Sequence, residues 1–83
     1  MNEKLRSIQE VAQLAGTTSR ALRHYDDIGL LPPAQIGSNG YRYYNQANLT
    51  RLQRILLLRQ LGLGLGQIAD VLDGTQDDTI ALE

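Results

Sequence analysis

Apolar residues recur at helical spacing near the start of the chain. They occupy the i, i+3, i+4 and i+7 positions of one helical face: Ile8, Val11, Ala12 and Ala15. Ser7 precedes this face and Glu10 follows three residues later. This is the pattern of a capping box, in which Ser accepts from the N3 amide and Glu reaches back to the N-cap. Gly16 is placed to end the helix in the left-handed conformation.

A second amphipathic stretch, "SRALRHYDDIG", comes soon afterwards. Thr18 stands directly before it and offers an N-cap. Leu22 and Tyr25, together with Ile28 or Ala21, form its expected inward face. Two short helices joined by a tight glycine turn are typical of a helix-turn-helix unit.

The stretch that follows leaves helical spacing. The Pro-Pro pair of "LLPPAQI" excludes helix and favours extended chain. Asn39-Gly40 is a strong hairpin-turn signal, and the following "YRYY" is rich in residues that favour strands. We expect residues 34–36 and 41–43 to pair as a two-stranded wing that leans on the helices, since an isolated hairpin is only marginally stable.

Strand alternation divides the aromatic residues of the wing between two faces. It puts Tyr41 and Tyr43 on one face and Arg42 and Tyr44 on the other. Tyr44 stands at the junction with the next helix, where alternation can fail. The stretch is therefore expected to supply both core and contact surface, with Arg42 as the contact residue.

Two further helical patterns complete the chain. Asn45 can cap "QANLTRLQRILLLRQLG", and Gly62 closes this helix. Its broad apolar face consists of Leu49, Leu52, Ile55, Leu56 and Leu58. The shorter "LGLGQIADVLDG" places four apolar residues inward: Leu65, Ile68, Ala69 and Leu72. Residues 75–78 look like another capping box that opens a fifth helix. The expected fold is mostly α with a small β-hairpin, a winged helix-turn-helix followed by two further helices.

Length and charge refine this picture. The chain has 83 residues, which predicts one domain. The net charge of −1 argues against a nucleic-acid partner, but residues 1–66 carry all eight Lys and Arg residues and four acids, whereas residues 67–83 carry five acids and no base. This asymmetry favours a nucleic-acid-binding face, and an acidic surface helix at the end is the alternative.

The residue types disfavour an enzyme. The chain has no cysteine, which excludes thiolate metal sites and thiol catalysis. His24 is the one histidine, and the acid pairs Asp26-Asp27 and Asp77-Asp78 are sequence neighbours that do not converge on one helix face. The glycine-rich "GLGLG" lacks the Lys and Ser/Thr of a phosphate-binding P-loop. We expect no catalytic residue, no cofactor and no metal.

The cytoplasm is the expected location. No apolar run approaches the roughly 20 residues of a membrane span. The opening "MNEKLRSIQE" lacks the apolar core of a signal peptide.

The outward face of the second helix favours DNA binding. With Leu22 and Tyr25 buried, the helical period puts one row of side chains on the opposite side: Arg20, Arg23, His24 and Asp27. Ser19 stands at the N-terminal end, from which a recognition helix enters the major groove. An ordinary solvated surface is the alternative. A wing beside such a helix brings arginine and tyrosine to DNA phosphates, and the presence of both elements favours DNA.

The sequence resembles the DNA-binding domain of the MerR family of transcription regulators. The resemblance covers roughly residues 5–74 and is carried by "SIQEVAQLAGTTSRALRHYDDIGLLPP" and "NGYRYYNQANLTRLQRILLLRQLGLGLGQIADVLDG". "HYDDIGLL" looks closest to the thiostrepton-responsive and multidrug-responsive branches. The family implies a long antiparallel coiled-coil helix for dimerisation and a variable effector domain. It also implies pseudo-palindromic promoters with an over-long spacer, which the dimer bends and untwists so that RNA polymerase can use them.

The resemblance also assigns contact residues. Six residues fall on recognition-helix positions: Thr18, Ser19, Arg20, Arg23, His24 and Tyr25. Tyr41 and Arg42 fall on wing positions. His24 stands where the family often has Tyr, and weaker capping is expected where the family often has Ser or Glu: Asn45, Gly64 and Gly66.

Residues 1–74 are thus expected to form the DNA-binding domain, and residues 75–83 to begin a truncated or missing dimerisation helix. The expected partners are double-stranded promoter DNA and, indirectly, RNA polymerase. A homodimer is expected only with a longer C-terminal helix, and no membrane partner is expected. Two alternatives remain open: a protein-interaction or antagonist module that pairs with a longer relative, and an excisionase-like architectural protein that bends DNA.

Overall fold

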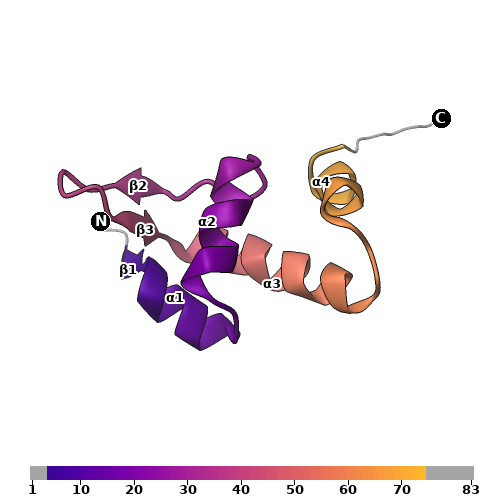
Figure 1. Cartoon of the computed structure of the whole chain (residues 1–83), viewed down its shortest axis with the longest axis horizontal. Coiled ribbons are helices and arrows are strands. Elements are labelled where there is room, and N and C mark those ends of the chain that lie inside the picture. Colours follow the sequence, from indigo (N-terminus) through magenta and orange to yellow (C-terminus); the bar gives the residue numbers. More distant parts are fainter. Residues whose placement is uncertain (1–3, 75–83) are drawn as a thin grey trace. The chain divides into compact units, whose positions relative to one another are not determined.

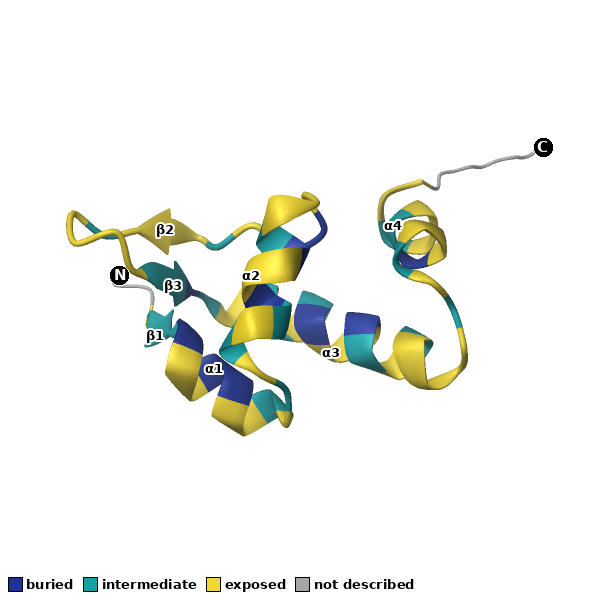
Figure 2. Ribbon diagram, in the orientation of Figure 1, coloured by how far each residue is buried: buried dark blue, intermediate teal, exposed yellow. Residues whose placement is uncertain are grey.

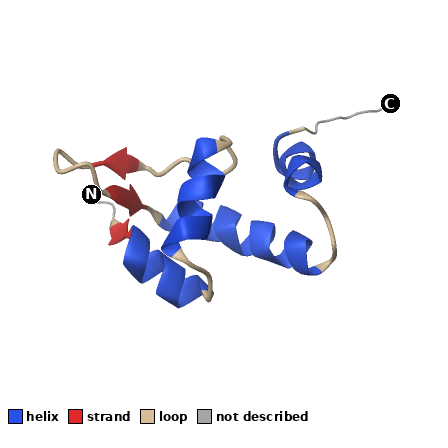
Figure 3. Ribbon diagram, in the orientation of Figure 1, coloured by secondary structure: helices blue, strands red, loops and turns tan. Residues whose placement is uncertain are grey.

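The computed structural model describes residues 4–74, and it is mostly helical with a small sheet (Figures 1 and 3). The chain divides into two compact units, Met1–Gln53 and Arg54–Glu83. The first unit holds helices α1 (Ile8–Ala15) and α2 (Ser19–Asp27), the sheet, and the start of α3 (Gln46–Gln60). The second holds the rest of α3 and α4 (Leu65–Asp73). This order of elements confirms the expected winged helix-turn-helix with two further helices.

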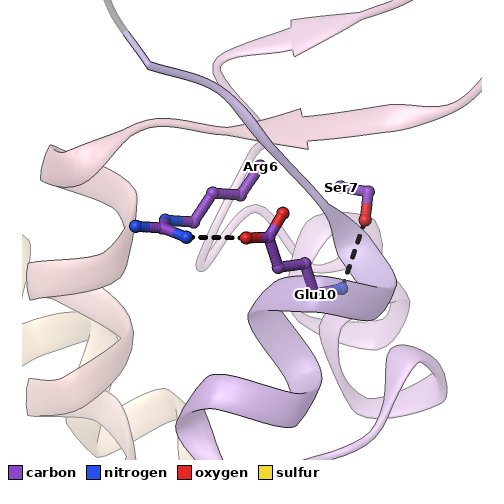
Figure 4. A network of polar contacts seen from close by, with 3 residues as sticks. All are labelled: Arg6, Ser7 and Glu10. Carbon is purple, nitrogen blue, oxygen red and sulfur yellow. Dashed lines mark hydrogen bonds and ion pairs between the residues drawn. The ribbon is translucent and has the colours of Figure 1, made fainter.

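Helix α1 begins and ends where its sequence signals lie. The Ser7 hydroxyl accepts from the amide of Glu10 at 3.2 Å, and Gly16 ends the helix with a φ of 72°. The Glu10 carboxylate, however, bonds to the guanidinium of Arg6 at 2.6 Å (Figure 4). The expected return bond from Glu10 to the N-cap is therefore replaced by an ion pair, and only the Ser7 half of the capping box forms.

Helix α2 packs against α1 and is capped at both ends. Thr18 Oγ1 accepts from the amide of Ala21 at 3.0 Å. At the other end, the amides of Leu30 and Leu31 both donate to the carbonyl of Tyr25, at 2.8 and 3.0 Å. Ile28 is 48% exposed, whereas Ala21 is half-buried. Of the two residues expected to face inward, Ala21 is therefore the one that does.

The wing is a three-stranded sheet rather than the expected two-stranded hairpin. Strands β2 (Gln35–Ile36) and β3 (Arg42–Tyr44) pair antiparallel as predicted, with Gln35 opposite Tyr43. A third strand, β1 (Arg6–Ser7), pairs with the other edge of β3 to give the order β1-β3-β2. The strand that leads into α1 thus joins the wing to the helix-turn-helix. This pairing supplies the support that the two-stranded hairpin was expected to need.

The turn of the wing lies where Asn39-Gly40 placed it. The amide of Gly40 donates to the carbonyl of Gly37, and the amide of Gly37 donates to the carbonyl of Tyr41, both at 2.8 Å. Gly40 has a φ of 82°, whereas no described non-glycine residue has a positive φ. The loop is therefore closed by a single left-handed glycine, a three-residue hairpin connection.

The core of the first unit lies between α1, α2, β3 and the start of α3. Its members are apolar or aromatic and at most 9% exposed (dark blue in Figure 2): Ile8, Val11, Ala12, Leu22, Tyr25, Leu30, Leu31, Tyr44 and Leu52. Arg51 Nε donates to the carbonyl of Leu30 at 2.8 Å, and the Asn48 amide donates to the carbonyl of Pro32 at 3.2 Å. These bonds fasten α3 to the segment that follows α2.

Helix α3 has stronger capping than expected. The Asn45 side chain accepts from the amide of Asn48, and the Asn48 side chain accepts from the amide of Asn45, both at 2.9 Å. The two asparagines form a complete reciprocal box, so the predicted weakness at Asn45 is wrong. The sequence pattern had not assigned a role to Asn48.

The second unit is built on the end of α3 and on α4. Ile55 and Ile68 are fully buried, and Gly62 closes α3 with a φ of 96°. Gly64 is the N-cap of α4 and has no side chain that could accept from the N3 amide, but its own amide donates to Gln67 Oε1 at 2.8 Å. Half of a capping box remains there. The predicted box at residues 75–78 and the fifth helix lie outside the described residues.

Candidate DNA-binding surface

Helix α2 presents a row of basic side chains on the side opposite its buried face. Leu22 is fully buried, whereas Arg20, Arg23 and His24 are exposed. This confirms the division of the helix that the 3.6-residue period predicted. An exposed row of this kind supplies donors to base edges and phosphates.

The N-terminal end of α2 brings two short polar side chains to the same surface. Thr18 is exposed, and its hydroxyl oxygen is occupied as a cap acceptor for Ala21. Ser19 is half-buried at the first helical position. The hydroxyl proton of Thr18 is not used by the cap and remains a donor.

Tyr25 belongs to the core rather than to the exposed row. It is 6% exposed, and the centre of its ring lies 6.4 Å from that of His24. Its carbonyl holds the turn that ends α2. The family position suggested a DNA contact for Tyr25, but its packing role is the one that the geometry supports, in agreement with the inward face drawn from the helical period.

Arg42 connects the wing to α2. Its Nε donates to Asp26 Oδ2 at 2.8 Å, and the two side chains are 26% and 20% exposed. The hydrogen bond to Asp26 raises the pKa of Arg42 against the opposing effect of desolvation. Asp26 is therefore the partner that orients the wing arginine, a role that the sequence pattern did not assign to it.

The wing tyrosines occupy three different environments. Tyr41 is 64% exposed near the wing tip, and Tyr43 is half-buried over Gly37, where an added Cβ would lie 3.0 Å from the Tyr43 ring. Tyr44 is fully buried, and within residues 4–74 its hydroxyl has no hydrogen-bond partner. Burial raises the pKa of Tyr44. Arg42 and Tyr44 thus share the side that faces the helices, as strand alternation predicted.

A hollow of about 240 Å³ opens between the start of α1, α2 and the wing tip. We call it the Arg23–Arg42 hollow, after the two arginines on its walls. Its lining comes from three separate segments: Ser7, Ile8 and Gln9; Arg23; and Gly40, Tyr41 and Arg42. The fold thus brings four of the predicted contact residues to two adjoining places, Arg20 and Arg23 on α2 and Tyr41 and Arg42 on the wing.

Two other kinds of feature, a metal site and a membrane-spanning helix, are absent from the described residues 4–74. Within the described residues 4–74, no three His, Asp or Glu side chains gather in a way that could hold a metal ion. In the same part of the chain, no helix has the length and apolar character to cross a membrane.

Residues 6–75 match the family described as MerR HTH family regulatory protein, and the chain belongs to this family. Among curated relatives, it is 49% identical over 72 residues to TipA, an HTH-type transcriptional activator of Streptomyces coelicolor. The aligned residues cover 87% of this chain and 28% of TipA. It is 42% identical over 66 residues to the transcriptional activator mta of Bacillus subtilis, covering 80% and 26% of the two chains.

Solved structures agree with the fold. MtaN, the N-terminus of the Bacillus subtilis multidrug transporter activator, superposes with a TM-score of 0.81 at 40% identity over 88% of this chain and 69% of MtaN. EcmrR in its complex with DNA superposes with a TM-score of 0.82 at 32% identity over 88% of this chain and 28% of EcmrR. The chain spans about a quarter of the length of these two curated relatives.

Proposed function

We propose that this chain is the DNA-binding part of a MerR-type transcription regulator and binds double-stranded promoter DNA sequence-specifically. The observation that carries the proposal is the pairing of two elements on one surface. Helix α2 exposes Arg20, Arg23 and His24, and the wing is fastened to that same helix by the bond between Arg42 and Asp26. The resemblance to EcmrR, whose structure is a complex with DNA, supports the same role.

In this role α2 lies in the major groove and the wing lies along the phosphate backbone. Thr18, Ser19 and Arg20 stand at the N-terminal half of α2, from which base edges are reached. An exposed arginine there donates two bonds to a guanine, a contact worth roughly 1–3 kcal/mol of discrimination. His24 lies further along the exposed row, and Tyr41 and Arg42 serve the backbone.

The regulatory step belongs to a dimer. Residues 1–74 act as the DNA-binding domain, and dimerisation requires the longer C-terminal helix that the family implies. The dimer activates an over-spaced promoter by distorting it, and RNA polymerase responds to the altered DNA. The protein is not an enzyme, needs no cofactor, has no membrane partner and works in the cytoplasm.

In-vitro selection from a random duplex library tests the proposal directly. The 83-residue chain is expected to enrich one motif and to bind the enriched duplex more tightly than a scrambled duplex of equal composition. Low salt is needed because phosphate contacts weaken steeply as salt rises. Binding without any motif, together with bending at many nearby sites, would favour an architectural DNA-bending protein instead. No DNA binding, but a stoichiometric complex with a longer relative, would favour an antagonist.

A further inference from the structure

The Arg23–Arg42 hollow has a cationic side chain on each of two walls. Arg23 reaches it from α2, and Arg42 reaches it from β3, next to Tyr41. The start of α1 closes the third side. Its volume of about 240 Å³ far exceeds the roughly 10–15 Å³ that one water needs, so the hollow has room for a tetrahedral anion beside the two arginines that line it.

The two arginines also share one electrostatic environment. The pKa of the buried Tyr44 hydroxyl is raised by burial, and the charges of Arg42 and Arg23 both oppose that rise. Both cations therefore act on one point beneath the wing. The charge of Asp26 acts in the opposite direction on the pKa of Tyr44, with an effect that ranks between those of Arg42 and Arg23.

Arg42 keeps donors to spare after its bond to Asp26. A guanidinium has five N–H donors in a fixed fork, and the bond to Asp26 uses Nε. With Nε fixed, the orientation of the fork is fixed too. An arginine held in this way is suited to a phosphate, which accepts two parallel bonds from one guanidinium.

From this geometry we infer that the hollow seats a single phosphate of the DNA backbone, and that Arg23 and Arg42 bind it together. The inference rests on the proposed DNA-binding function and deepens it. It separates the two exposed arginines of α2: Arg20 reads a base, whereas Arg23 binds the backbone and carries no sequence information. Sequence periodicity alone put both arginines on one stripe and gave them one role.

Salt dependence and sequence preference test the shared phosphate. The probes are a duplex selected by the wild-type chain and its scrambled counterpart, and affinities are measured across a series of salt concentrations. Arg23→Ala is expected to weaken binding to both duplexes by the same factor, so the ratio of the two affinities stays unchanged. Arg20→Ala is expected to weaken binding mainly to the selected duplex, so the ratio falls.

The double variant Arg23→Ala/Arg42→Ala tests whether one phosphate is shared. The slope of log affinity against log salt changes by about 0.9 for each phosphate contact. One shared phosphate predicts a total change of about 0.9 in the double variant, and an affinity loss smaller than the product of the two single losses. Two separate phosphates predict a change of about 1.8 and independent losses, which overturns the inference.

Two further variants keep the outcome interpretable. Arg23→Lys retains the charge and is expected to retain the wild-type salt slope, since Lys binds phosphate as a point charge. Arg54→Ala removes an exposed arginine that does not line the hollow. The affinity losses of Arg54→Ala and Arg42→Ala are therefore expected to be independent of each other. A fall in sequence preference in Arg23→Ala makes Arg23 a base reader and overturns the inference, while the proposed function stands. A wild-type chain that binds neither duplex overturns the proposed function itself.

Discussion

Nε of Arg42 lies 2.8 Å from Oδ2 of Asp26, and this one bond joins the middle strand of the wing to α2. Both side chains are mostly shielded, at 26% and 20% exposed. Ion pairs that are fully exposed contribute little, whereas removal of one partner from a buried pair is costly. The half-buried position of this pair puts it between those limits, so it both stabilises the wing and sets the direction of Arg42.

A double-mutant cycle on this pair is the first prediction. Asp26→Asn and Arg42→Ala are each expected to lower the free energy of unfolding by roughly 1 kcal/mol. The double variant is expected to lose less than the sum, because either single change already breaks the bond. Urea unfolding followed by circular dichroism measures all four free energies. Asp27→Asn, on the exposed neighbour, serves as the matched control, and additive losses for Asp26 and Arg42 would show that the bond does not couple them.

The buried hydroxyl of Tyr44 gives the second prediction. It has no hydrogen-bond partner among the described residues, and an unsatisfied buried hydroxyl costs about 1–3 kcal/mol. Tyr44→Phe keeps the ring that fills the core and removes the unpaired group. We expect the variant to unfold at the same or a higher urea concentration, by an increment on the order of 1 kcal/mol. A clear loss of stability would mean that the hydroxyl makes a favourable contact in solution.

The same tyrosine predicts how stability depends on alkaline pH. Burial raises the pKa of Tyr44 in the folded chain, so the unfolded chain releases the proton first. Stability is then fully present below the ordinary tyrosine pKa of about 10 and is lost as the pH rises through the folded value. Tyr44→Phe is expected to flatten this alkaline loss. Urea midpoints of the wild-type chain and of this variant, measured on both sides of that pH, make the comparison.

The local features of the fold could be predicted because their causes are local. Ser7, Thr18 and Asn45 cap the helices at which they stand in the sequence, and Gly16 and Gly62 end helices with positive φ. Each signal acts within about one helical turn. Strand β1 was missed because two residues show no periodicity, and its partner strand lies far along the chain.

In the candidate site, too, local features could be predicted from the sequence and contacts between distant segments could not. The exposure of Arg20 and Arg23 followed from the helical period, since the buried position of Leu22 fixes the opposite face. The bond between Arg42 and Asp26 did not follow, because it links two elements that only the folded wing brings together. The Arg23–Arg42 hollow could not be predicted either, because its lining comes from three separate segments and no one of these segments carries a sequence signal for it.

Two glycines with equally open surroundings give the fourth prediction. An added Cβ would meet nothing within 4 Å at Gly40 or at Gly66, but Gly40 has a φ of 82° and Gly66 lies within α4 without a positive φ. Gly40→Ala is expected to cost roughly 1–2 kcal/mol, because L-residues are strained in the left-handed region. Gly66→Ala is expected to stabilise by roughly 0.5–1 kcal/mol through helix propensity. Thermal unfolding of both variants measures the opposite signs, and equal signs would contradict the assigned backbone conformations.

Dimerisation gives the last prediction. A regulator of this family is expected to bind two half-sites, and linking two binding modules raises the overall affinity by about 10²–10⁴-fold without any new contact. Fusing a parallel or antiparallel coiled coil after the chain is therefore expected to tighten binding to a duplex with two copies of the selected motif, but not to a duplex with one copy. The gain is expected to depend on half-site spacing, with optima separated by one helical turn of about 10 base pairs. Arg20→Ala in the same fusion serves as the control and is expected to lose sequence preference at both half-sites; a gain that ignores spacing would mean that the two domains bind the backbone without docking their recognition helices.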